Sequence, residues 1–513
     1  MQWQLPVLLR LRNNALVQSG DVSCILFEGV PMYWWRARVE RMLREGSYEG
    51  YVREYIRAFK RTPDDDKEFV ANVSRRLQTV ERHFLDHRDD FFEREGLLEK
   101  LTVGELEAKY TSEISTVRWV DAISWAWART VNESYTVYLA HPAALELFNS
   151  LLLNFSSEDV ELFIGWLVIQ TLAPSVSLKL RDLLFVNTTV EQGPYSWLTL
   201  ERCLELTSSL FGVSAWSPLL RERVTLQTRD GAVLLLEAIE NSLKARLKES
   251  DWMDGQSVDI AQRTIESMKS VAGHPAEVES NAVRYGLYKK VPDLRENFFD
   301  SWQQITLSII PLVKRSWGYA DLYTYDPMGH GVHFYDDSHT LAMPDQNLVM
   351  PYFHQAAPRA VNMGGLGALV ARGFMQAFDR TSESIGGINR NSWSASTKKA
   401  FEDRYACVAQ AYGEDWDERI ARRQFGDLAA IHSLYKAFSP APTLRRRLYG
   451  LEEFTPDQTF FVSFCHALCV RDPADRVARA RCNVPLMNLR WFSEVFGCRK
   501  RERMNPSKRC AFW

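Results

Sequence analysis

The pattern of apolar and polar residues predicts helices along most of the first 320 residues. Residues 157–173 (SEDVELFIGWLVIQTLA) form a largely apolar run that predicts a buried helix. Residues 79–110 are charged and periodic, with Thr102 placed as a cap and Glu105 three residues later, the spacing of a capping box. DIAQRTIESMKSVAG predicts an amphipathic helix that ends at Gly273. Strand signals are few here, so the pattern indicates a mainly α protein with a small mixed α+β part.

The pattern changes between about residues 316 and 360, where Gly, Pro, Asp and aromatic residues become frequent. This composition predicts loops and short strands that lead into a second part of the chain. Helical periodicity returns at 366–380, 396–412 and 416–438, and the last 30 residues are expected to be irregular. The sequence therefore predicts a helical N-terminal lobe over 1–334 and a C-terminal domain over 335–513.

Composition and charge exclude several classes of function. Hydrophobic residues make up 46% of the chain, and 62 Lys and Arg against 65 Asp and Glu give a net charge of −3, so no basic field predicts a nucleic-acid partner. No stretch reaches the roughly 18 apolar residues of a membrane span. At the start, only PVLL precedes Arg10 and Arg12, too short for a signal-peptide core.

Cysteines, sequons and one histidine cluster are candidate chemical sites. No C-x-x-C occurs, which argues against a zinc ribbon. Four N-x-S/T sequons are candidate glycosylation sites: Asn72, Asn132, Asn154 and Asn187. In GHGVHFYDDSH, histidines with flanking carboxylates form a weak candidate zinc site, the alternative being ordinary loop histidines: His330, His333, Asp336, Asp337 and His339.

Five segments, in order along the chain, carry a resemblance to one family. They are WMDGQSVDIAQRTIESMKSVAGHP, AVNMGG (360–365), DQTFFVSFCHALC, RCNVPLMNLRWFSEVFGC and the ending MNPSKRCAFW. Together they resemble the neprilysin and endothelin-converting-enzyme family of zinc metallopeptidases. The resemblance implies a two-lobed, mainly helical fold, in which a thermolysin-like C-terminal lobe and a helical lid lobe enclose a chamber that admits peptides.

The stretch GGLGALVARGFMQAFD resembles the zinc helix of that family only in its packing residues. An apolar side chain recurs every four residues, at Leu366, Val370, Phe374 and Phe378. By resemblance, Arg372 and Gln376 stand at the two zinc-histidine positions, Gly373 at the general base and Arg423 at the third ligand. Arginine has no lone pair to donate to a metal. We therefore expect neither zinc, the cofactor of active members, nor hydrolysis.

Two acidic positions of the family site remain, Asp379 and Asp427. We hypothesise that Arg372 or Arg423 pairs with one of them, so that ion pairs replace the metal; the alternative is that these side chains point at solvent. The resemblance also places Arg481 at the position that grips a substrate carbonyl. Asp475 stands where the family has the histidine that steadies the reaction intermediate.

By resemblance, the strand that holds the substrate lies near SHTLAMPDQN, which contains Ala342 but no convincing asparagine partner.

The resemblance further implies a disulfide between Cys407 and Cys510. Cys203, Cys469 and Cys498 also match family cysteines, whose partners lie in an N-terminal segment that this chain lacks, so we expect a truncated chain. The pairing of Cys24, Cys465 and Cys482 stays open.

These observations lead to one functional hypothesis and two alternatives. The hypothesis is a non-catalytic relative of neprilysin, extracellular or at the cell surface, that binds peptides or an active family relative. The first alternative is an active zinc metalloendopeptidase with a non-standard site, for which the histidines of 330–339 are candidates. The second is a decaying, inactive copy.

Overall fold

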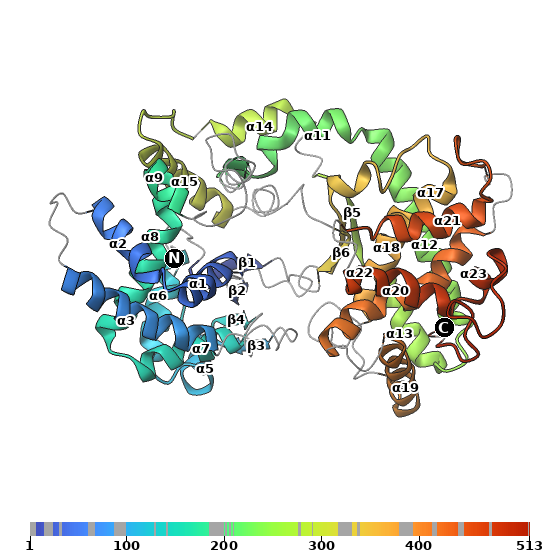
Figure 1. The fold of residues 1–513 in the computed structure, drawn as a ribbon, viewed down its shortest axis with the longest axis horizontal. Coiled ribbons are helices and arrows are strands. Elements are labelled where there is room, and N and C mark those ends of the chain that lie inside the picture. Colours follow the sequence, from blue (N-terminus) through green and yellow to red (C-terminus); the bar gives the residue numbers. More distant parts are fainter. Residues whose placement is uncertain are drawn as a thin grey trace. The chain divides into compact units, whose positions relative to one another are not determined.

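Helices form most of the protein in the computed structural model (Figure 1). The structure describes residues 7–14, 24–29, 33–59, 67–86, 99–127, 130–139, 142–183, 200, 203–204, 207–208, 210–274, 279–289, 291–315, 331–335, 339–378, 393–412, 418–439, 446–470, 475–510 and 512. The chain folds into two compact units, an N-terminal unit of 1–211 with 285–323 and a C-terminal unit of 212–284 with 324–513. Each unit is made of two separate stretches of the chain. The domain boundary between residues 334 and 335 stays a prediction.

The N-terminal unit is largely helical. Its longer helices are α1 (Tyr33–Glu45), α2 (Tyr48–Phe59), α3 (Lys67–Asp86), α6 (Thr116–Trp127), α7 (Pro142–Asn154), α8 (Ser157–Val176) and α15 (Phe298–Arg315). Shorter ones are α5 (Val103–Lys109), α9 (Leu178–Leu183) and α14 (Asn281–Tyr288), the last of which crosses from one unit to the other. The helix predicted at 157–173 is confirmed by α8. Thr102 caps α5 as predicted, and its backbone N–H donates to Glu105 Oε2 at 2.7 Å.

A four-stranded sheet lies in the same unit, in the order β1 (Leu9–Asn14), β2 (Cys24–Gly29), β4 (Thr136–Leu139), β3 (Glu99–Thr102). Strands β2 and β4 are parallel and the other neighbours are antiparallel. The helical prediction over 79–110 is therefore wrong at β3. Leu101 pairs with Val137 and is buried, so contacts with a distant segment decide the local conformation.

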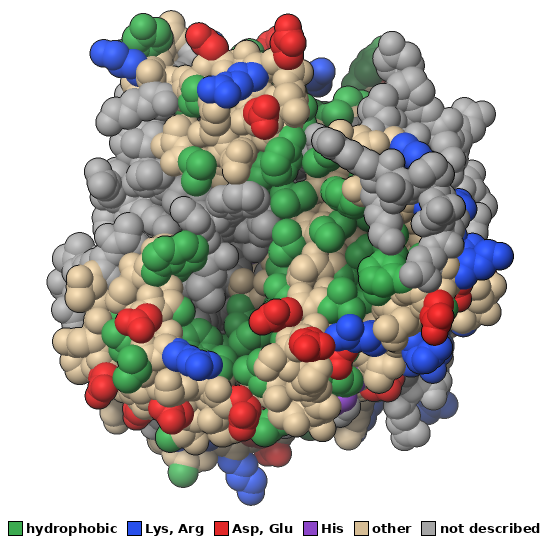
Figure 2. Space-filling view, turned by 90° about the vertical axis from the view of Figure 1, so that its left-hand side faces the viewer, with side chains coloured by type: hydrophobic (Ala, Val, Ile, Leu, Met, Phe, Trp, Pro, Cys, Tyr) green, Lys and Arg blue, Asp and Glu red, His purple; other side chains and the backbone are tan. Residues whose placement is uncertain are grey.

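The surface of one face mixes both signs of charge. Figure 2 shows Lys and Arg side chains interspersed with Asp and Glu side chains, with hydrophobic side chains between them, over the described part of that face. Several large apolar side chains of the N-terminal unit are exposed, among them Trp125 and Leu153. Within the described ranges, no helix is long and apolar enough to cross a bilayer.

The C-terminal unit is a second helical body. Its helices are α11 (Ser217–Arg223), α12 (Leu226–Lys248), α13 (Gly255–Glu266), α17 (Arg359–Gly364), α18 (Leu366–Gln376), α19 (Ala395–Tyr412), α20 (Glu418–Phe438), α21 (Pro456–His466), α22 (Arg476–Asn488) and α23 (Arg490–Val495), with 3-10 turns at Gly212–Trp216 and Asp345–Leu348. The helices predicted at 366–380, 396–412 and 416–438 match α18, α19 and α20. The prediction that the last 30 residues are irregular is wrong at α23. Phe492 of this helix packs against Phe461 of α21.

A three-stranded sheet in this unit has the order β5 (Lys269–Ala272), β7 (Thr340–Met343), β6 (His333–Tyr335). Strands β5 and β7 are parallel, and β6 and β7 are antiparallel. The helix predicted to reach Gly273 is wrong, since α13 ends at Glu266 and β5 follows. The substrate strand predicted near Ala342 is also placed wrongly. Ala342 lies on β7, which is paired on both sides, so β7 has no free edge for a peptide strand.

Two disulfides cross-link residues within the C-terminal unit. Cys407–Cys510, predicted by resemblance, is confirmed and closes a loop of 103 residues. Cys465–Cys482 joins α21 to α22, which the sequence did not reveal. The thiols of Cys203, Cys469 and Cys498 are free, while the side chain of Cys24 lies outside the described residues.

Glycosylation of the four sequons stays a prediction. Asn72, Asn132 and Asn154 have exposed side chains, so they meet one requirement of a glycosylation site. Asn187 lies outside the described residues.

Candidate functional site

The candidate site lies where α18 packs against α20. Nearly every side chain of α18 is buried, but Arg372 keeps 23% of its side chain exposed. Its stem crosses α20 at Gly426, where an added Cβ would come within 3.1 Å of Arg372 Cγ. The absence of a side chain at Gly426 therefore makes room for the long side chain at 372.

Asp427, the next residue on α20, is the acceptor of this site. Its carboxylate is only 4% exposed. Arg481 of α22 donates from Nε to Oδ2 at 2.8 Å and from Nη2 to Oδ1 at 3.4 Å. Arg372 Nε lies 3.7 Å from Oδ1, at ion-pair distance but beyond a hydrogen bond. The hypothesised pairing of Arg372 with Asp427 is therefore present as an ion pair. Asp379 and the side chain of Arg423 lie outside the described residues.

The buried phenol of Tyr412 lies beside the same charges. Burial and then the charge of Asp427 hold the pKa of Tyr412 well above its ordinary value, while Arg481 and Arg372 oppose that rise. The phenol is therefore neutral at physiological pH. Because the phenol of Tyr412 carries no charge, it neither strengthens nor weakens the ion pairs of Asp427.

Gly373, which the resemblance assigns to the general-base position, is enclosed by apolar side chains. A Cβ built there would come 2.7 Å from Leu341 Cδ1 of β7 and 3.0 Å from Val332 Cγ1, just before β6. Leu341 is 0% exposed and Val332 3%, so both are held in the core. The sheet thus occupies the space that a side chain at 373 would need.

Gln376, which the resemblance assigns to the second histidine position, binds the main chain of the sheet. Its Oε1 accepts the backbone N–H of Phe334 at 2.7 Å. Phe334 lies on β6, one of the two outer strands in the sheet order, so Gln376 fastens this strand to α18. A bond of this kind satisfies a backbone donor that would otherwise need water.

Arg481 and Asp475 both belong to α22. Asp475 is the N-cap of the helix, and its Oδ1 accepts the N–H of Ala478 at 3.0 Å. A capping carboxylate stabilises the helix start and explains an acidic residue here without a role in chemistry. Cys482 follows Arg481 directly, so the disulfide to Cys465 fixes the backbone that carries this arginine.

The histidines of 330–339 do not converge in the part of the chain that the structure describes. His339 Nε2 lies 2.9 Å from the carbonyl oxygen of Thr264 and 2.9 Å from Ser267 Oγ, so this ring binds the end of α13. His333 is exposed on β6, and His330, Asp336 and Asp337 lie outside the described residues. Among described residues, no group of three His, Cys, Asp or Glu is placed to hold a metal ion.

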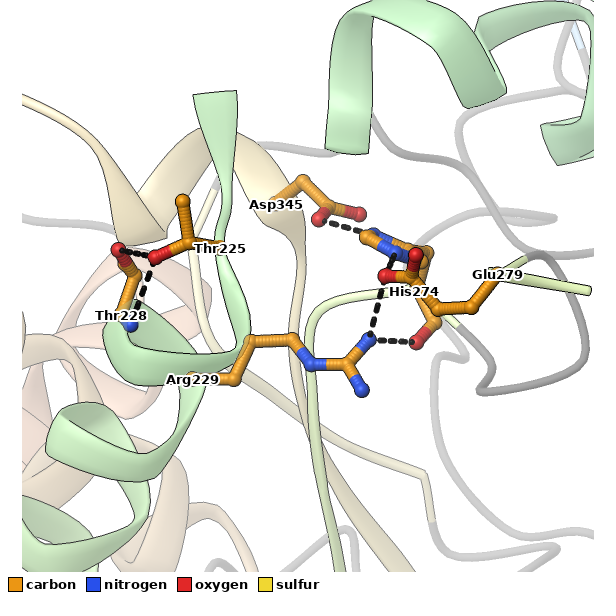
Figure 3. Close-up of polar contacts among 6 residues, drawn as sticks. All are labelled: Thr225, Thr228, Arg229, His274, Glu279 and Asp345. Carbon is orange, nitrogen blue, oxygen red and sulfur yellow. Dashed lines mark hydrogen bonds and ion pairs between the residues drawn. The ribbon is translucent and has the colours of Figure 1, made fainter. Parts of the chain in front are cut away.

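A buried histidine that the sequence did not single out anchors the sheet (Figure 3). His274 Nδ1 lies 2.7 Å from Asp345 Oδ1, and Nε2 lies 2.8 Å from Glu279 Oε1. Arg229 of α12 donates to the carbonyl oxygen of His274 at 3.1 Å and lies 3.8 Å from Glu279 Oε1. The cluster joins the residues after β5 to those after β7. A signal was available in the sequence, because Gly273 and Pro275 flank this histidine, and Gly273 has a positive φ of 72°.

The cluster favours the charged form of His274. Burial lowers the pKa of the ring, but hydrogen bonding and the charge of Asp345, with the hydrogen bond of Glu279, outweigh burial and raise the pKa above its ordinary value. A neutral imidazole has one N–H and could donate to only one of the two carboxylates. The imidazolium donates to both, which is the physical reason for the raised pKa.

Stability of the C-terminal unit should therefore fall at alkaline pH. The contribution of His274 is complete below the unfolded pKa of about 6.5 and is lost as pH rises through the higher folded pKa, at about 1.4 kcal/mol per unit of pKa difference. Urea unfolding of the chain and of His274→Asn, measured from pH 6 to pH 9, checks this expectation. The variant should lose this part of the pH dependence. His466→Gln, at an exposed position, should keep it.

The fold is that of a metallopeptidase, and the site between α18 and α20 holds the residues for which the sequence resemblance predicts a catalytic centre. Residues 36–275 and 333–512 match the two sequence models of "Peptidase family M13", and the chain belongs to this family. Neprilysin-11 of Caenorhabditis elegans is 22% identical over 387 residues, which covers 68% of this chain and 45% of the relative. Neprilysin-3 of Drosophila melanogaster is 22% identical over 442 residues, with 77% and 55% covered.

A solved structure supports the fold independently. The zinc metalloprotease Zmp1 of Mycobacterium tuberculosis, in complex with an inhibitor, superimposes with a TM-score of 0.76 at 16% identity, over 98% of this chain and 80% of that one. Identity at this level is evidence for the fold alone. The chain spans about half the length of the curated relatives that it matches.

Proposed function

We propose that this member of family M13 binds peptides, or an active relative, without hydrolysing them, as an extracellular or cell-surface protein. The relatives with similar sequences are named neprilysins and endothelin-converting enzymes, which supports a peptide as the ligand class. The proposal separates two properties that occur together in a peptidase, the capacity to hold a peptide and the capacity to activate water.

The environment of Gly373 carries the proposal. Hydrolysis by a metallopeptidase of this kind needs a carboxylate beside the metal to take a proton from water. Position 373 supplies no side chain, and Leu341 and Val332 fill the space around it. A water molecule there would have no polar side chain from position 373 to receive its proton.

The residues around this position do not fit a zinc ion. Zinc requires lone pairs from imidazole, thiolate or carboxylate groups. Arg372 has none, and the carbonyl oxygen of Gln376 is used by the N–H of Phe334. The carboxylate of Asp427 faces two guanidinium groups, which would also repel a cation brought close to them. A hydrolytic step through zinc therefore does not fit these residues.

Peptide contact is proposed for Arg481. Its side chain is 21% exposed, so solvent reaches it even though Nε and Nη2 are bonded to Asp427. A guanidinium has five N–H donors, so one arginine can bind both a carboxylate and a peptide carbonyl. The pair with Asp427 would then hold the side chain in one orientation for the ligand.

Metal analysis and a peptide panel test the proposal. Protein purified with added zinc should hold much less than one zinc per chain, and mass spectrometry should find no cleavage of a peptide panel. Fluorescence anisotropy should detect binding of at least one uncleaved peptide, weakened about tenfold or more in Arg481→Ala. Stoichiometric zinc or turnover abolished by a chelator would favour the active enzyme instead. A folded protein that binds neither peptide nor active relative would contradict the binding role.

A further inference from the structure

A cavity of about 420 Å³ lies in the C-terminal unit and shares no lining residue with the Arg372–Asp427–Arg481 site. It is formed by α12, the segment that leads into α17, α17 itself and Arg446. This volume falls within the range of about 300 to 1,000 Å³ typical of small-ligand sites. The cavity is therefore large enough for a compact ligand.

One part of the cavity is apolar. Phe353 and Met363 are 3% and 0% exposed, which makes them fixed parts of the core. The ring of Phe353 lies against α12 at Gly231, where an added Cβ would come 3.2 Å from its Cζ. Leu234, which also lines the cavity, is 66% exposed and lacks cover from the described residues. Leu234, next to the small exposed part of Phe353, therefore offers an apolar group a partly preformed surface.

The other part carries positive charge. Arg359 donates from Nη2 to the carbonyl oxygen of Ala437 in the last turn of α20 at 2.8 Å. Its Nε is buried without a hydrogen-bond partner, and burial lowers the pKa of Arg359. Arg446 lines the same cavity and is exposed. The two guanidinium groups place positive charge at this part of the cavity, which an anionic ligand would complement.

We propose that this cavity binds a carboxylate attached to an apolar group, such as the C-terminal residue of a peptide with an apolar side chain. The carboxylate meets Arg359 and Arg446, and the apolar group lies on Phe353 and Leu234. Asp230 lines the same cavity and carries a negative charge, which disfavours a phosphate dianion relative to a single carboxylate. The inference goes beyond the proposed function, because it needs neither Arg481 nor a loss of hydrolysis.

Calorimetry on the full chain with two matched ligands tests the site. An N-acetylated peptide that ends in leucine with a free carboxylate should bind at least tenfold more tightly than the same peptide with a C-terminal amide. Arg446→Ala, at an exposed position, should weaken the free acid about tenfold and leave the melting temperature unchanged. Arg359→Gln should weaken it similarly. Arg503→Ala, which removes an exposed charge outside the cavity, should bind like the unchanged protein.

The outcomes distinguish a peptide from other apolar carboxylates as the ligand, and they distinguish this inference from the proposed function. Octanoate that binds competitively with the peptide would support the site and widen the ligand class to any apolar carboxylate. Equal binding of the acid and the amide, no binding of either, or full binding by Arg446→Ala would each overturn the inference. The proposed function is tested by zinc content, peptide cleavage and the loss of peptide binding in Arg481→Ala, and this cavity by the Arg446 and Arg359 variants, so a failure here is distinct from a failure of the proposed function.

Discussion

Replacing Asp427 with asparagine is expected to lower the free energy of unfolding of the C-terminal unit by about 3 kcal/mol. The amide keeps the shape of the carboxylate but removes the negative charge between Arg372 and Arg481. Two partly buried guanidinium groups would then remain without their shared counter-ion. Because the carboxylate is 4% exposed and the arginine side chains are 23% and 21% exposed, water can compensate for only part of the loss.

Urea unfolding with both disulfides intact measures this effect. Glu494→Gln is the matched control, because its ion pair with Arg490 lies at the surface, with side chains 52% and 79% exposed. That substitution should cost less than about 1 kcal/mol. Combining Asp427→Asn with Arg481→Gln should cost less than the sum of the single changes, since the two side chains contact each other. An Asp427→Asn variant as stable as the Glu494→Gln control would show that the charge cluster contributes nothing.

The sequence predicted the elements of this site better than their contacts. The apolar repeat at Leu366, Val370 and Phe374 is local, and it predicted α18 to within a few residues. The contact of Arg481 with Asp427 spans 54 positions and joins two helices, which no periodic pattern records. Arg481 was expected to face a substrate, whereas in the structure it also holds a carboxylate.

The short strands were the elements that the sequence failed to predict. A four-residue strand such as β5 has too few alternating positions to stand out from the amphipathic helix before it. Its conformation depends on pairing with β7, whose residues lie about 70 positions later, as in the pair Lys269 and Thr340. The packing of Leu341 on Gly373 also joins segments that are distant in the sequence, so it could not be predicted from the local pattern. Tertiary pairing therefore overrode the local pattern.

The residues at the positions that the resemblance assigns to the catalytic site fit their surroundings, which bears on the alternative of a decaying copy. Gly426 leaves space for the stem of Arg372, and Gln376 satisfies the main chain of Phe334. A disulfide that the sequence left open, Cys465–Cys482, braces the backbone beside Arg481. Random substitution of packed residues would leave voids at such positions. This mutual fit favours a structure maintained for binding.

Introducing glutamate at Gly373 is expected to destabilise the C-terminal unit by at least about 3 kcal/mol, the larger part from overpacking and the rest from a buried carboxylate. The Cβ alone would lie 2.7 Å from Leu341 Cδ1, and helix α18 cannot retreat because its other side packs on α20. For the same reason Arg372→His, Gly373→Glu and Gln376→His combined should not yield stoichiometric zinc binding. Thermal unfolding and metal analysis of the purified variants measure both effects.

Gly373→Ala keeps the test decisive even where the glutamate variant does not fold. Alanine stabilises an open helix position by up to about 1 kcal/mol relative to glycine, and Gly165→Ala on α8, with no atom within 4 Å of its Cβ, should show that gain. Gly373→Ala should instead lower stability by about 1 to 2 kcal/mol. Adding Leu341→Ala should make the double change less costly than the sum of the single ones, because it removes the atom in conflict. Gly373→Ala that stabilises the protein as Gly165→Ala does would mean that the sheet leaves room at this position.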